Sequence, residues 1–513
     1  MKTKCLICFC LVLTAINTAG CRKKSQPTEK QSMPQVEVSQ KPTAEQIQPE
    51  EPEYFALFME GKKVGHAIQD RVVEDSKVTT SVELEITLNR TGIPVSVQTK
   101  VDTFETTDGK PLGFDVEQTL GLIATKTTAT IDELGKLIVK TGQQQMEYDW
   151  PSGAVMSEGM RLMHYKHGLK EGNSYTVKIF EPSTMQAIDV EIEVGSKQNI
   201  DLLGRVAALT EVKSIANLPQ FGSFTSTEYY DDNLLLQKSI TPVMGMTVEQ
   251  VACTKEFALS ENDALEMVEK MFLASPQPLD DVGSTKSIIY KLSRTEKTAE
   301  FFIPSNDNQK VQQLSDGQVI VAVEPVDAPV GVSFPYKGND AAIIEATRPT
   351  RFLQSDNAQI INLARQAVGR TKDAAEAAKK IEAFVADYIE NKSLSVGYAS
   401  SVEVAQSRQG DCTEFAVLTA AMCRAVGIPA QVVAGVAYVD DFAGLRGFGG
   451  HAWTQAYIGG KWIGLDAAFK GTGRGGYDAG HIALAAGNGE PGDFLNLATT
   501  LGRFKIQKVT VKR

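Results

Sequence analysis

The chain has 513 residues, of which 42% are hydrophobic and 22% are charged. This composition is typical of a globular protein of about three domains, and it excludes a wholly disordered chain, a fibrous repeat and a polytopic membrane protein. The 52 Lys and Arg residues against 63 Asp and Glu residues leave a net charge of −11, which argues against a nucleic-acid partner because such binding needs a clustered basic surface.

Residues 1–20 are predicted to be a signal peptide. Two lysines precede an apolar stretch from Cys5 to Ile16, which as a helix would span only about 18 Å against roughly 30 Å of hydrocarbon. The ending Thr18–Cys21 resembles the bacterial lipobox, which implies cleavage before Cys21 and lipid attachment to it. We therefore expect an exported protein, lipid-anchored to the bacterial cell envelope; secretion without a lipid is the alternative.

Residues 21–53 are predicted to be a lipidated cysteine followed by a disordered tether. The stretch 22–53 holds five of the twenty prolines and many polar residues, with almost no large apolar side chain. Such a segment cannot bury enough surface to offset the entropy lost on ordering. A tether after a lipidated Cys21 would hold a folded body away from a membrane.

The next three segments are predicted to be mainly β-structure. Residues 54–259 alternate polar and apolar positions between turn signals, which predicts a large, strongly curved antiparallel β domain. Residues 260–283 form a helix and linker in this interpretation, with an amphipathic helix from Ser260 to Ala274. Residues 284–350 predict a small β segment with strands near 288–292, 300–303 and 318–323.

Residues 351–513 show helical periodicity followed by strands. Helices are expected at 360–367, 377–388 and 412–426, and strands near 431–439, 451–458 and 461–466. Helices followed by an antiparallel sheet indicate an α+β fold.

The mature chain would keep four cysteines, too few for a disulfide framework: Cys21, Cys253, Cys412 and Cys423. Cys412 and Cys423 are predicted on one helix about 16 Å apart, so they cannot pair. Cys253 and Cys423 are interpreted as inert packing, whereas Cys412 is an unpaired thiol at a helix start.

The start of that helix is well specified. Asp411 can cap it, and Glu414 completes a variant capping box. The helix N-terminus favours a thiolate at Cys412, but the two carboxylates oppose it, so a cationic partner such as an imidazolium is required.

His451 is the histidine whose position supplies that partner. Gly459-Gly460 predicts a two-residue hairpin turn, and counting back from it places Trp453 opposite Asp466. His451, two residues before Trp453, then lies on the same face, diagonally beside Asp466. In this arrangement Cys412 attacks a carbonyl, His451 transfers the proton, and Asp466 fixes the tautomer of His451.

At these positions the chain resembles the transglutaminase-like superfamily, relatives of papain-like cysteine proteases. The resemblance rests on the blocks Gly410–Gly435, His451–Trp462 and Leu465–Phe469. Members commonly have Pro after the Asp, where this chain has Ala467. The resemblance implies a papain-like fold with Cys412, His451 and Asp466 as the triad, and it leaves peptide hydrolysis, amide transfer and loss of activity open.

The other histidines show no comparable pattern. His66 and His481 lack a partner pattern, and His164 and His167 are expected in a solvated loop or strand end rather than at a metal. No metal or cofactor site is predicted.

Two functions remain open. One is a cell-envelope cysteine enzyme acting on peptide or protein substrates, with hydrolysis preferred over transamidation because water is always available. The other is a membrane-tethered scaffold with a catalytically silent transglutaminase-like domain, suggested by the long β region 54–259, which lacks chemical motifs. The oligomeric state is left open.

Overall fold

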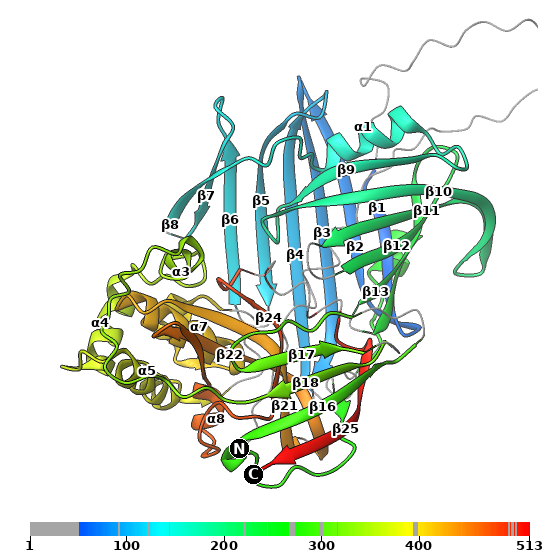
Figure 1. Ribbon diagram of the computed structural model, residues 1–513. Coiled ribbons are helices and arrows are strands. Elements are labelled where there is room, and N and C mark those ends of the chain that lie inside the picture. Colours follow the sequence, from blue (N-terminus) through cyan, green and yellow to red (C-terminus); the bar gives the residue numbers. More distant parts are fainter. Residues whose placement is uncertain are drawn as a thin grey trace, which may run out of the picture.

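The computed structural model describes fourteen stretches of the chain (Figure 1): residues 51–90, 93–120, 123–142, 144–218, 222–243, 245–265, 272–296, 301–314, 317–392, 399–442, 444–490, 493, 497 and 500–513. The expected signal peptide, Cys21 and nearly all of the tether lie outside these residues. None of the helices in these stretches combines the length and the hydrophobicity that crossing a bilayer requires.

A 14-stranded antiparallel sheet forms the N-terminal part of the molecule. It consists of two meanders that meet where β1 pairs with β14, with Tyr54 opposite Cys253. Its strands are β1 (Glu53–Met59), β2 (Lys62–Glu74), β3 (Lys77–Arg90), β4 (Ile93–Thr106), β5 (Pro111–Leu120), β6 (Ile123–Ile131), β7 (Lys136–Thr141), β8 (Gln144–Asp149), β9 (Ser174–Glu181), β10 (Gln186–Leu202), β11 (Arg205–Leu218), β12 (Gly222–Tyr230), β13 (Leu236–Val243) and β14 (Met246–Cys253). The predicted large antiparallel β domain is confirmed.

The sheet is strongly curved. In Figure 1 the strands β1 to β6 stand upright, while β9 to β12 run across them. Helix α1 (Ser157–His167) connects the two meanders between β8 and β9, and its Met160 is buried in the core. The turn between β1 and β2 falls at Glu60-Gly61, where both residues have positive φ. Apolar side chains at alternate positions of β3 are buried, as the sequence pattern predicts: Val78, Val82, Leu84, Ile86 and Leu88.

The predicted helix from Ser260 to Ala274 is wrong at both of its ends; residues 266–271 lie outside the described residues. A short helix, α2 (Lys255–Ala258), ends before it. Residues 260–265 are irregular because Lys63 of β2 binds them: its amino group donates to the Ser260 carbonyl at 2.7 Å and to Asn262 at 2.8 Å. Leu273–Ala274 is instead strand β15, paired with β22. Contacts with distant strands override the amphipathic pattern here.

A four-stranded sheet, ordered β17-β18-β16-β25, follows. Its strands are β16 (Ser287–Arg294), β17 (Gln309–Gln313), β18 (Val319–Val323) and β25 (Phe504–Lys512). A single 3₁₀ turn, η3 (Val282–Ser284), comes before β16. Residues 301–303 form no strand, contrary to the prediction near 300–303, and the Phe301 ring packs against Phe504 with centroids 5.3 Å apart. The last strand of the chain thus joins the sheet of the small β segment.

The C-terminal part places helices against a five-stranded antiparallel sheet in which β15, β22, β21 and β24 are neighbours and β23 pairs with β22. Helix α7 lies at its centre and contacts β21 and β22 together with α4, α5 and α6. The elements are α3 (Ala341–Glu345), α4 (Ala358–Val368), α5 (Ala374–Tyr388), β19 (Asn391–Lys392), α6 (Ser401–Ser407), β20 (Gln409–Gly410), α7 (Cys412–Ala425), β21 (Ala430–Phe442), β22 (Leu445–Ile458), β23 (Lys461–Leu465), α8 (Ala467–Lys470) and β24 (His481–Gly487).

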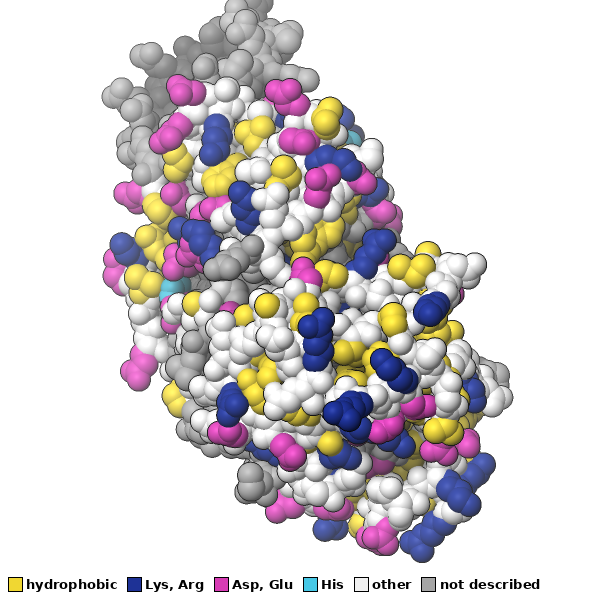
Figure 2. All heavy atoms as spheres, turned by 90° about the vertical axis from the view of Figure 1, so that its left-hand side faces the viewer, with side chains coloured by type: hydrophobic (Ala, Val, Ile, Leu, Met, Phe, Trp, Pro, Cys, Tyr) yellow, Lys and Arg dark blue, Asp and Glu magenta, His cyan; other side chains and the backbone are white. Residues whose placement is uncertain are grey.

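The α+β prediction therefore describes the C-terminal part, whereas antiparallel sheet dominates the whole molecule. Figure 2 views the side of the molecule that carries α4 and α5, and Lys and Arg side chains are interspersed there with Asp and Glu. On α5 the Lys380 amino group lies 2.7 Å from a Glu376 carboxylate oxygen. A mixed surface of this kind is typical of a globular protein.

Candidate active site

Cys412 is the first residue of α7, and the predicted capping box is present. The Asp411 carboxylate accepts hydrogen bonds from the Thr413 backbone N–H at 3.1 Å and its hydroxyl at 2.9 Å. Glu414 returns to accept from the Asp411 N–H at 2.8 Å. Every residue from Cys412 to Arg424 is buried, so the helix holds the thiol inside the domain.

The carboxylates beside Cys412 are held by neutral donors. The Cys412 sulfur lies 3.8 Å from Asp411 Oδ1. Burial and then the charge of Asp411 raise the pKa of Glu414 well above its usual range. When Glu414 is protonated, Asp411 is the carboxylate of this pair that remains negative. Its charge opposes a thiolate at Cys412.

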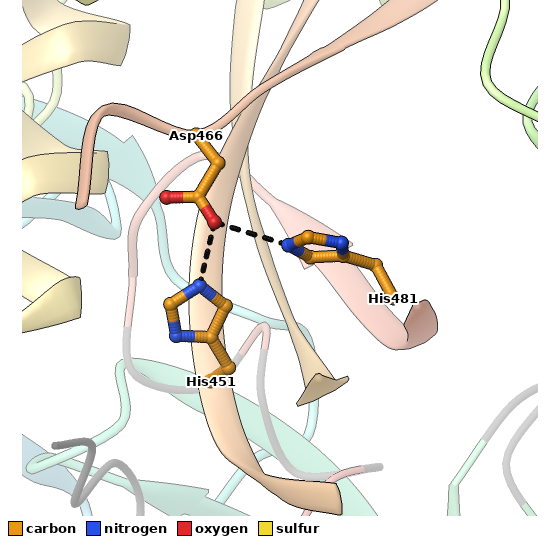
Figure 3. Close-up of side chains that lie close together, drawn as sticks. All are labelled: His451, Asp466 and His481. Carbon is orange, nitrogen blue, oxygen red and sulfur yellow. Dashed lines mark hydrogen bonds and ion pairs between the residues drawn. The ribbon is translucent and has the colours of Figure 1, made fainter. Parts of the chain in front are cut away.

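The His451–Asp466 pair follows from the register of a hairpin. Gly459 and Gly460 both have positive φ and form the two-residue turn, with Ile458 paired to Lys461 as predicted. His451 Nε2 lies 2.8 Å from Asp466 Oδ2 (Figure 3). The hydrogen bond leaves the second ring nitrogen, Nδ1, for another partner.

Cys412 also contributes to the electrostatics of the His451 ring. The His451 ring is buried, which lowers its pKa, but the charge and hydrogen bond of Asp466, followed by a hydrogen bond and charge from Cys412, raise the pKa to about 9. His451 therefore has a hydrogen bond of 2.8 Å to Asp466 and an electrostatic interaction with Cys412, the other two residues that the sequence singles out. A cationic imidazole beside a thiol is the arrangement that activates a cysteine.

Several hydrogen bonds hold Asp466 in place. Besides His451, its Oδ1 accepts from the Phe469 N–H at 2.9 Å as the N-cap of α8, and its own N–H donates to Glu382. Burial would raise the pKa of Asp466, but His451 and then His481 hold it far below its usual range. The acid therefore stays ionised although its side chain is buried.

His481 also belongs to the site, and sequence reasoning missed it. Its Nε2 lies 3.0 Å from Asp466 Oδ2, and its Nδ1 lies 3.1 Å from Asp478 Oδ1 (Figure 3 draws the contact with Asp466). The three-residue spacing of Asp478 and His481 is a local signal that could have indicated their pairing. The contact with Asp466 has no such signal, because it depends on β24 packing beside β21.

His451, Asp466 and His481 also bring their ligand atoms within 4.8 Å of one another, close enough to hold a metal ion. Both ring nitrogens, however, lie at hydrogen-bond distance from one carboxylate oxygen. Each ring therefore has the carboxylate as a hydrogen-bond acceptor, and the charge and hydrogen bonds of the acids around them raise the pKa of both rings. The described residues thus form a hydrogen-bond network at this carboxylate.

The prediction for His164 is wrong, whereas the structure agrees with that for Cys423. His164 does not lie in a solvated loop or strand end: it is buried in α1, and its Nδ1 lies 2.8 Å from the Tyr175 hydroxyl, because α1 packs inside the curved sheet. Cys423 is fully buried on α7, and burial raises its pKa to about 12, which fits inert packing.

Comparisons with known proteins agree with this region. Residues 361–467, which include Cys412, His451 and Asp466, match the family model of the transglutaminase-like superfamily. Comparison with the curated proteins found no match.

Several solved structures show some likeness. One is a candidate cysteine protease from Cytophaga hutchinsonii, 21% identical, covering 44% of this chain and 85% of that chain with a TM-score of 0.29. A protein with a domain of unknown function from Brucella abortus is 12% identical and covers 40% of this chain and 96% of that chain, with a TM-score of 0.30. A TGase is 14% identical, covering 32% and 44% with a TM-score of 0.18. The family match shows that this chain carries a C-terminal transglutaminase-like domain.

Proposed function

We propose that this protein is a cysteine enzyme that transfers acyl groups from peptide or amide substrates, with Cys412 as nucleophile, His451 as proton carrier and Asp466 as its orienting acid. The observation that carries the proposal is the buried His451, which is hydrogen-bonded to Asp466 through Nε2 and also interacts with Cys412. Peptide or protein amides are the proposed substrates, and hydrolysis is preferred over transfer to an amine.

The chemistry balances with these three side chains. The Cys412 thiolate attacks the carbonyl carbon, and a C–S bond forms as the carbonyl π electrons move to oxygen. When the tetrahedral intermediate collapses, the C–N bond breaks and the leaving nitrogen takes the proton of the His451 imidazolium. Water then attacks the thioester while His451 accepts its proton, and the acid is released with the thiolate restored. Asp466 remains ionised throughout and holds the ring.

The test compares two cysteines of one helix. Cys412 and Cys423 both have no exposed surface, so Cys412→Ala and Cys423→Ala are matched variants of buried thiols. We expect turnover of a peptide and amide library to be lost in Cys412→Ala and kept in Cys423→Ala. Turnover that survives in Cys412→Ala would overturn the proposal. Adding a primary amine probe separates hydrolysis, which releases the acid, from transfer, which labels the substrate.

We also propose that the enzyme is exported and anchored to the cell envelope through a lipid on Cys21. The lipobox-like ending Thr18–Cys21 and the proline-rich stretch 22–53 support this proposal. We expect mass spectrometry of the N-terminal peptide to find a lipid on Cys21. In cell fractionation, Cys21→Ala is expected to be released from the membrane fraction. An N-terminal peptide without a lipid would contradict it.

A further inference from the structure

Asp466 accepts hydrogen bonds from two imidazoles at one oxygen. His451 reaches Oδ2 at 2.8 Å and His481 reaches it at 3.0 Å, from strands that flank β21 on either side (Figure 3). His481 has no exposed surface, and His451 is 5% exposed. A single hydrogen bond to His451 would already orient that ring, so the second imidazole needs an explanation of its own.

The surroundings of His481 indicate its protonation state. Its Nδ1 lies 3.1 Å from Asp478 Oδ1 and 3.0 Å from the Asp478 carbonyl oxygen, two acceptors that favour a protonated Nδ1. The Asp478 backbone N–H, which could donate only to an unprotonated Nδ1, is more distant at 3.4 Å. A neutral imidazole has one N–H, so it cannot donate at both nitrogens. Donation to Asp466 and Asp478 together requires an imidazolium. Burial lowers the pKa of His481, but hydrogen bonds to these two acids raise it overall.

Asp478 is itself fixed from behind. Arg474 donates to both of its oxygens, from Nε at 2.6 Å and from Nη2 at 2.9 Å. Burial opposes the charge on Asp478, but His481 and Arg474 lower its pKa to about 2. Positive and negative groups therefore alternate from Arg474 through Asp478, His481 and Asp466 to His451, and no charge in this row lacks an opposite neighbour.

The aromatic side chains around His481 restrict its ring. Tyr477 lies with its ring centroid 4.7 Å away, Trp453 approaches edge-on at 5.0 Å and Phe469 lies at 5.2 Å. Phe469 also stacks on His451 at 4.3 Å, with an interplanar angle of 17°. The two imidazoles are thus held in fixed orientations toward one carboxylate.

We propose that His481 is a positioning residue of the site, whose imidazolium fixes the Asp466 carboxylate so that Oδ2 is held in place for His451. With Oδ1 bound to the Phe469 N–H, the second imidazole prevents rotation of the carboxylate about its Cβ–Cγ bond. The effect on turnover rests on the proposed function, whereas the hydrogen-bond arrangement does not.

The test uses two substitutions of His481 that separate the loss of its hydrogen-bond donor from the loss of its planar ring. His481→Phe keeps a planar ring without a donor, and His481→Gln keeps a neutral N–H₂ donor near the position of Nε2. We expect His481→Phe to lower kcat about 10- to 100-fold with KM within about twofold, since the lost hydrogen bond to a charged group acts on orientation and not on substrate binding. His481→Gln should recover most of kcat. His66→Gln, in β2 of the large sheet, is the control and should match the wild type.

A second measurement needs no substrate. In protein labelled with ¹⁵N-histidine, we expect both ring nitrogens of His481 to carry protons at neutral pH, and the His451 Nε2–H signal to shift or exchange faster in His481→Phe. If His481→Phe does not fold, the protonation state of the His481 ring in the wild type decides the question.

The outcomes distinguish the two proposals. Unchanged kcat in His481→Phe, or a wild-type His481 with an unprotonated ring nitrogen, would overturn the positioning role, while loss of turnover in Cys412→Ala would still support the proposed function. Turnover retained in Cys412→Ala would overturn the proposed function, and the NMR signals alone would then judge the His481 hydrogen bonds.

Discussion

The carboxylate of Glu382 on helix α5 accepts a hydrogen bond of 2.8 Å from the backbone N–H of Asp466, 84 residues later in the chain. Both side chains are buried, at 6% and 1% exposure. The second oxygen of Glu382 lies 3.6 Å from the Lys470 amino group. The helical layer thereby holds the backbone of the residue that binds both histidines.

We expect Glu382→Ala to destabilise the protein by about 1–3 kcal/mol, because it leaves the buried N–H of Asp466 without its acceptor. Glu382→Gln keeps a carbonyl oxygen there and should retain most of that stability. Urea unfolding measures the difference. Glu376→Ala, on the exposed side of the same helix, is the control and should stay within about 0.5 kcal/mol of the wild type. Equal unfolding midpoints for Glu382→Ala and the wild type would refute this role.

Asp411 has two separable effects, one on the helix and one on the thiol. Asp411→Asn keeps the oxygen that caps α7 but removes the negative charge 3.8 Å from the Cys412 sulfur. We expect its stability to stay close to that of the wild type and Cys412 to be alkylated several-fold faster at neutral pH. Asp411→Ala should show the same faster alkylation with about 0.5–2 kcal/mol lower stability, because the cap is lost. Slower alkylation in both variants would contradict the electrostatic explanation.

The raised pKa of His451, about 9, predicts how Cys412 reacts across pH. Below that value the ring is cationic and stabilises the thiolate, so iodoacetamide should label Cys412 at similar rates between about pH 6 and 8. An unperturbed thiol, with a pKa near 8.5, would lose about tenfold per pH unit in that range. Peptide mapping resolves Cys412 from Cys423, which should remain nearly unlabelled.

His451→Gln removes the cation, and we expect Cys412 to be alkylated at least about tenfold more slowly at pH 7 in this variant. A His451→Gln rate equal to that of the wild type would show that the imidazole does not activate the sulfur.

The raised pKa of Glu228, in the large sheet, predicts that the protein loses stability as pH rises. It accepts hydrogen bonds from the Tyr230 hydroxyl at 2.6 Å and the Ser214 hydroxyl at 2.9 Å, and burial raises its pKa from 4.5 to about 7. The folded state therefore binds the proton more tightly than the unfolded state. Its stabilising effect is complete below about pH 4.5 and is lost as pH rises through 7, by about 3 kcal/mol in total.

Glu228→Gln should remove that part of the pH dependence in urea unfolding between pH 4.5 and 8. The buried Glu105, whose pKa burial also raises to about 7, should still contribute pH dependence in this variant. Glu147→Gln, whose side chain is 62% exposed, serves as the control. Stability curves of wild type and Glu228→Gln that stay parallel across this range would contradict the prediction.

Local chemistry in the sequence is sufficient for the parts of the site that lie near one another in the chain. The start of α7 follows from Asp411 and Glu414, three residues apart, and the His451–Asp466 pair follows from a hairpin whose turn is Gly459-Gly460. Caps, turns and alternating strands act between chain neighbours, so their outcome can be read without knowing the rest of the fold.

Contacts between distant segments could not be predicted in this way. His481 reaches Asp466 only because β24 pairs with β21, and Glu382 reaches it only because α5 packs against that hairpin. Likewise residues 260–265 are not helical as predicted, and Lys63, about 200 residues earlier, binds the Ser260 carbonyl and the Asn262 side chain there. The sequence by itself determined the candidate site residues Cys412, His451 and Asp466 through local rules, whereas tertiary packing alone decided what holds Asp466, because packing energies depend on surfaces that meet only in the folded chain.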